Sequence, residues 1–101
     1  MREVCRFKFP EGTDPEIAEV QLGLAIIAAE SAFGHAKVRI NAAYCLSRER
    51  RQVVIDVSSP VGEHIAEVFT GLMTRQLGEE GFTVERVHGS PTPGGADGHG
   101  A

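Results

Sequence analysis

The sequence lacks several features that define whole classes of protein. It contains no tryptophan, one tyrosine and two cysteines in 101 residues, and its 10 lysines and arginines are outnumbered by 14 aspartates and glutamates. The net charge of −4 removes the broad positive field that drives nonspecific binding to nucleic acid or to anionic membranes. The two cysteines, Cys5 and Cys45, are too few for a disulfide framework and form no Cys-x-x-Cys pair. We therefore expect no metal site and no cofactor.

Long apolar segments are also absent. The longest stretch without a charge runs from Val20 to Ala29, which is ten residues, whereas a helix that crosses a bilayer needs about 20. The N-terminus enters a strand-like alternation at once and carries no apolar targeting segment. We expect a cytoplasmic protein without a membrane partner.

Glycine and proline are concentrated at the C-terminal end of the chain. Residues 89–101 contain five glycines and two prolines, and they have no aliphatic side chain larger than alanine. Such a segment cannot bury enough apolar surface to offset the entropy lost on ordering. We predict one folded domain over residues 1–88 and a disordered tail over residues 89–101. A domain of this size buries only about 60% of its surface on folding, so self-association would add stability.

Hydrophobic periodicity predicts four strands and two helices. The segments with the period of two that is typical of half-buried strands cover residues 4–9, 37–46, 52–57 and 82–87. Helix-start signals at Thr13 and Ser59 precede two amphipathic segments, which end at Gly34 and near Gly78. The order β-α-β-β-α-β predicts an α+β domain, a ferredoxin-like sandwich with two helices on one face of a four-stranded antiparallel sheet. That fold implies the strand order 4-1-3-2.

The first predicted helix is apolar on two sides. One stripe contains Ile17, Val20, Leu24, Ile27 and Ala28, and a nearly opposite stripe contains Leu22, Ile26, Ala29 and Phe33. Because one sheet covers only one stripe, we predict that the second stripe is an oligomer interface with another copy of the chain. The alternative is that the second helix flanks the first and covers this stripe. The long predicted strand over residues 36–46 offers another route to self-association, through edge-to-edge pairing.

A candidate ligand site lies at one end of the predicted sheet. We expect His35, Ser58, Ser59 and His64 to lie near each other there. Free amides at the start of the second helix, with hydroxyls and an imidazole beside them, would hold a phosphate or a carboxylate. The alternative is that Ser59 only caps the helix and that the histidines are ordinary surface residues. No His-x-His or His-x-x-x-His spacing indicates a metal.

The turn between the second and third predicted strands is rich in arginine. Arg48, Arg50 and Arg51 lie within four residues of each other. They form either a surface ion-pair cluster with nearby glutamates or a contact with a partner protein or an anionic effector. Nucleic acid is not the expected partner, because the aromatic side chains all fall on the core-facing phase and leave none on the open sheet face for stacking.

The sequence carries no recognisable catalytic constellation. The serines lack a Gly-x-Ser-x-Gly turn, and no glycine-rich loop for phosphate is present. We predict a small non-catalytic homo-oligomeric structural or regulatory module that acts by self-assembly or by binding another protein. Two alternatives remain. One is a sensor that binds a small anionic ligand at a subunit interface, and the other is an enzyme whose active site is completed by another chain.

Overall fold

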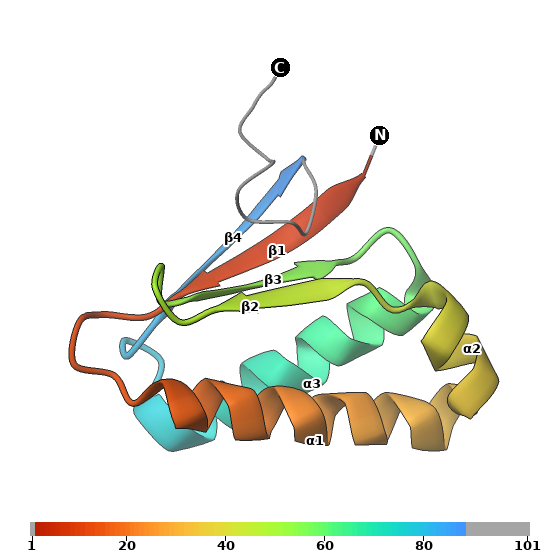
Figure 1. The fold of residues 1–101 in the computed structure, drawn as a ribbon, viewed down its shortest axis with the longest axis horizontal. Helices are drawn as coiled ribbons and strands as arrows, with labels where there is room; N and C mark the ends of the chain where they lie inside the picture. Colours follow the sequence, from red (N-terminus) through yellow and green to blue (C-terminus); the bar gives the residue numbers. More distant parts are fainter. Residues whose placement is uncertain (1, 89–101) are drawn as a thin grey trace.

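A computed structural model describes residues 2–88 of the chain. Its elements, in chain order, are β1 (Glu3–Lys8), α1 (Pro15–Phe33), α2 (His35–Asn41), β2 (Tyr44–Ser47), β3 (Gln52–Asp56), α3 (Pro60–Leu77) and β4 (Thr83–His88). The four strands form one antiparallel sheet of order β2-β3-β1-β4. Helices α1 and α3 lie side by side on one face of this sheet (Figure 1). The α+β class is therefore confirmed. The predicted tail over residues 89–101 lies outside the described residues.

The strand order is the predicted one read from the opposite edge, but the order of elements departs from the predicted βαββαβ pattern. The strand predicted over residues 37–46 is wrong in its first half, where helix α2 is found instead. A helix separates the two apolar residues of this segment, so that Val38 is buried and Ile40 is 80% exposed. A strand would have placed both on one face. In so short a segment the apolar spacing fits either structure, and packing of Val38 against the core selects the helix.

Helix α3 begins where its capping residue predicts, and helix α1 begins one residue later than predicted. Asp14, one residue after the expected cap, accepts a hydrogen bond from the Glu16 amide at 3.0 Å. Ser59 accepts one from the Gly62 amide at 3.1 Å, and each helix has a proline in its first turn. These local bonds satisfy amides that the helix itself leaves without partners, which is why the helix starts are readable from sequence.

The core lies between the sheet and the two long helices. Phe7 of β1 meets Phe69 of α3 edge to face, with ring centroids 4.8 Å apart, and both side chains are fully buried. Helix α3 starts close against the end of β3. A Cβ atom on Gly62 would lie 1.8 Å from the Asp56 carbonyl oxygen, so only glycine fits at this position. No helix within residues 2–88 is long and apolar enough to cross a membrane.

Candidate functional site

The β2–β3 hairpin holds an arginine in a conformation that favours glycine. The turn is closed by a hydrogen bond from the Arg51 amide to the Arg48 carbonyl at 3.2 Å. Arg51 has a φ of 52°, in the left-handed region, and its carbonyl accepts a hydrogen bond from the Phe9 amide at 2.9 Å. Hairpins of this kind usually place glycine there, because a side chain in the left-handed conformation costs about 1–2 kcal/mol. The hairpin therefore retains the Arg51 side chain at a conformational cost.

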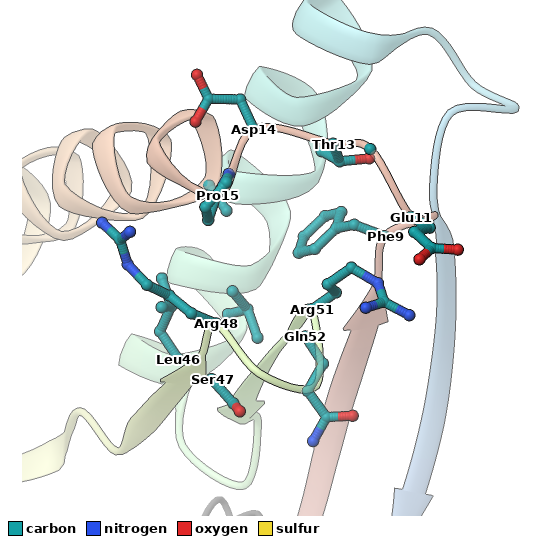
Figure 2. Close-up of a pocket in the computed structure, with 13 residues that line it drawn as sticks. Phe9, Glu11, Thr13, Asp14, Pro15, Leu46, Ser47, Arg48, Arg51 and Gln52 are labelled. Atoms are coloured by element: carbon teal, nitrogen blue, oxygen red, sulfur yellow. The ribbon is translucent and has the colours of Figure 1, made fainter.

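A cavity of about 220 Å³ lies between this hairpin and the loop that leads into α1 (Figure 2). Its inner wall is apolar and is formed by Phe9, Ala18, Leu46 and Val53, which come from β2, β3, α1 and the end of β1. Three of these residues are buried and Leu46 is half-buried. The polar rim is built from the hairpin and from the residues before α1. An apolar wall with a few polar groups at its mouth is the usual construction of a small-molecule site.

The two arginines at the rim of this cavity differ in their partners. Arg48 donates a hydrogen bond from Nε to Glu19 of α1, and this bond and the glutamate charge raise the pKa of Arg48 above its ordinary value. Arg51 lies on the other side of the cavity, beside Phe9 (Figure 2), and forms no ion pair with any described residue. Glu11 also lies at the rim and is likewise without an ion pair in the part of the chain that the structure describes. Arg51 is therefore the rim cation available to an anion.

The predicted arginine cluster is thus divided by the structure. Arg48 and Arg51 line the cavity, whereas Arg50 does not and donates its amide to the Ser47 hydroxyl at 3.2 Å. The glutamate that pairs with Arg48 is Glu19, which no sequence pattern singled out. The cavity itself was also missed, because its walls come from segments far apart in the sequence.

A second cavity, of about 260 Å³, lies where α3 begins. Ser58 and Ser59 of the predicted ligand site line it, together with Arg2 and Asp56. Both serine hydroxyls already have structural partners. Ser58 Oγ accepts a hydrogen bond from the Glu3 amide at 3.1 Å, and Ser59 Oγ caps α3. The buried carboxylate of Asp56 accepts from the Ser58 amide at 2.8 Å and pairs with Arg2 at 2.7 Å. The cation that lines this cavity, Arg2, is therefore already paired with the Asp56 carboxylate.

The two predicted histidines do not line the second cavity. His35 Nδ1 lies 3.0 Å from a carboxylate oxygen of Glu30, and the ring of His64 meets Phe33 edge to face at 5.6 Å between centroids. The structure therefore brings the two serines together but does not join the histidines to them. Residues 2–88 contain no group of three or more His, Cys, Asp or Glu side chains that could hold a metal ion.

Cys5 shows no sign of activation as a nucleophile. Its thiol is partly buried on β1, and desolvation raises its pKa, although the positive charge of Arg86 opposes this effect. A raised pKa lowers the fraction of thiolate, which is the reactive form.

The predicted interface stripe of α1 faces the interior. Leu22 and Ala29 are buried in the core, and Ile26 and Phe33 pack partly against it. Helix α3 flanks α1, which agrees with the alternative that the second predicted long helix covers this stripe. The prediction placed the other stripe against the sheet, whereas the structure turns the stripe of Leu22, Ile26, Ala29 and Phe33 inward. The face that packs inward instead contains the small residues Ala18, Ala25 and Ala29, which let the helix approach closely.

Of the stripe that we expect to face the core, Ile17 packs partly against it and Ala28 is half-buried, but the other three residues are exposed. Val20, Leu24 and Ile27 are 50%, 46% and 58% exposed, and we call these three residues the α1 stripe. Comparison of the chain with protein-family models, with curated proteins and with solved structures finds no match. The functional assignment therefore rests on the α1 stripe and the two cavities.

Proposed function

We propose that the protein is a small non-catalytic module that works by self-association, and that a second copy of the chain binds the α1 stripe. The exposure of Val20, Leu24 and Ile27 carries this proposal. Their spacing of four and three residues places them along one side of the helix. Large apolar side chains that form a continuous exposed patch are typical of interaction surfaces, whereas isolated ones are not.

The composition of α1 favours close contact with another helix. No charged residue interrupts the helix between Val20 and Ala29. Gly23 lies on the exposed side, and a Cβ at this position would meet nothing within 4 Å. A glycine at a helix surface lets a second backbone approach closely, so Gly23 and Leu24 can form the centre of the contact.

The charges at the two ends of the stripe favour an antiparallel pair. Asp14, Glu16 and Glu19 lie at the start of α1, and Lys37 and Arg39 lie in α2, directly after its end. A twofold axis near Leu24 would bring the acidic start of one α1 toward Lys37 and Arg39 in α2 of the other copy, because α1 itself has no basic residue in its last turn. Such complementarity fixes orientation and accelerates association.

We also propose that the fold is a ferredoxin-like sandwich into which α2 has been inserted between α1 and β2. The strand order β2-β3-β1-β4 and the position of α1 and α3 on one face of the sheet support this interpretation. The insertion would shorten β2 to four residues, so less edge is left for strand pairing, and this favours the helical interface.

Sedimentation velocity of the full chain tests the self-association. We expect a dimer for the native sequence and a monomer for Leu24→Glu, because the new carboxylate would be buried without a partner at the contact. Gln76→Glu is the matched control, since it makes the same charge in an exposed position of α3 and should leave the dimer intact. A monomeric native chain at about 100 μM, one hundred times a Kd of 1 μM, contradicts the proposal. An unchanged dimer in Leu24→Glu contradicts the choice of surface.

A further inference from the structure

The cavity beneath the β2–β3 hairpin has the construction of a ligand site that self-association does not use. We propose that it binds a small monocarboxylate, whose apolar part contacts Phe9, Leu46 and Val53 and whose carboxylate pairs with Arg51. This inference is independent of the α1 stripe, because the cavity opens between the hairpin and the start of α1 and includes none of the three stripe residues.

The apolar inner wall favours a ligand with an apolar part. Phe9, Ala18 and Val53 are at most 8% exposed and still border the cavity, so the part of an occupant that reaches this wall meets aliphatic and aromatic carbon. A sugar or a nucleotide would have to leave its polar groups without partners there, which is costly. A hydrocarbon chain or ring has no polar groups and therefore does not incur this cost.

The rim decides the charge of the ligand. Arg48 already pairs with Glu19, and the carboxylate of Asp14 already caps α1. Of the two arginines that line the cavity, Arg51 is the one whose guanidinium forms no ion pair with another residue of 2–88. A planar guanidinium matches the two oxygens of a carboxylate, which it can bind through paired hydrogen bonds. Glu11 and Asp14 also line the cavity, and their charges repel a singly charged carboxylate less than a doubly charged phosphate ester.

The left-handed backbone conformation of Arg51 indicates that its side chain serves a function. At a φ of 52° glycine or asparagine would be less strained. Strain of this kind is found where a side chain serves a function other than stability.

The size of the cavity limits the ligand. A volume of about 220 Å³ corresponds to roughly seven water molecules at about 30 Å³ each. An aliphatic or aromatic group of about that size fits inside it, such as the apolar part of hexanoate or benzoate.

Titration of the isotopically labelled full chain by NMR tests the inference. The probes are sodium hexanoate and sodium benzoate, with hexanamide and benzamide as neutral analogues of the same shape, all at constant ionic strength. We expect saturable shifts of the amides around the cavity, at Gly12, Ser47 and Gln52, with at least one carboxylate. The corresponding amide should bind at least about tenfold more weakly, because it lacks the charge-assisted pair.

Two variants identify the anchor. Arg51→Asn removes the cation while keeping a residue that tolerates the left-handed conformation, so the hairpin should fold and carboxylate binding should weaken at least about tenfold. Arg50→Gln removes a neighbouring charge that does not line the cavity and should change binding less than about twofold. Absence of saturable binding of either carboxylate up to about 10 mM, ten times a Kd of 1 mM, overturns the proposal. Equal binding by Arg51→Asn and the native chain overturns it as well.

Discussion

The two ends of the sheet contain similar polar residues and use them differently. Where α3 begins, the Asp56 carboxylate and the hydroxyls of Ser58 and Ser59 all have partners within the chain. At the hairpin end, the Arg51 guanidinium has no ion-pair partner among residues 2–88. Polar groups with internal partners stabilise the fold, and those without them are available to a ligand. The comparison therefore contrasts an end whose polar groups named above all have internal partners with an end where Arg51 is without an ion pair and where we propose that a ligand binds.

The largest expected effect is at the end where α3 begins. Gly62→Ala would place a Cβ 1.8 Å from the Asp56 carbonyl oxygen, which is backbone and cannot move freely. We expect a loss of about 3 kcal/mol in the free energy of unfolding, measured by urea denaturation. Gly71→Ala is the control, because a Cβ there meets nothing within 4 Å, and it should stabilise α3 by up to about 1 kcal/mol. Similar effects of the two variants would show that α3 is not held closely against β3.

A smaller effect is expected when the carboxylate at the same end is removed. Asp56→Ala would leave the Ser58 amide without its acceptor and Arg2 without its partner, at a cost of about 2 kcal/mol. Glu85→Ala removes a carboxylate that pairs with Arg6 on the open surface and should cost less than about 1 kcal/mol. Thermal denaturation of both variants gives the comparison. Equal losses would mean that the hydrogen bonds of the buried Asp56 carboxylate stabilise the fold no more than the exposed ion pair of Glu85.

The smallest expected effect has the opposite sign and lies at the hairpin end. Arg51→Gly would relieve the left-handed backbone strain at φ 52° and should raise the free energy of unfolding by about 1 kcal/mol. The same variant should lose carboxylate binding, so stability and binding would move in opposite directions. A loss of stability in this variant would show that the Arg51 side chain is a structural residue, and the contrast between the two ends would disappear.

The features that follow from local chemistry could be predicted from the sequence. The helix starts predicted at Thr13 and Ser59 depend on residues within three positions of the cap, and the structure places them at Asp14 and Ser59. The strand order was implied by the ferredoxin-like fold and agrees with the observed order. Helix α2 was missed because Val38 and Ile40 are spaced two residues apart, which fits a strand, and only packing shows that one is buried and the other exposed.

The site and the interface could not be predicted in the same way. The two apolar stripes of α1 differ little in hydrophobicity, and the choice between them depends on how closely the helix approaches the sheet. The hairpin cavity joins two stretches of the chain, residues 9–18 and 46–53, that lie far apart in the sequence. One signal was readable, namely an arginine at the last position of a short hairpin turn, Arg51, where glycine is the usual residue.

The most direct test of self-association through α1 is cross-linking at its centre. A chain carrying Cys5→Ser, Cys45→Ser and Leu24→Cys is oxidised under mild conditions, and the products are separated without reductant. An antiparallel contact with its axis near Leu24 predicts a covalent dimer for this chain and none for the matched chain with Gln76→Cys. The absence of a dimer at position 24, or equal yields at both positions, would contradict the proposed interface.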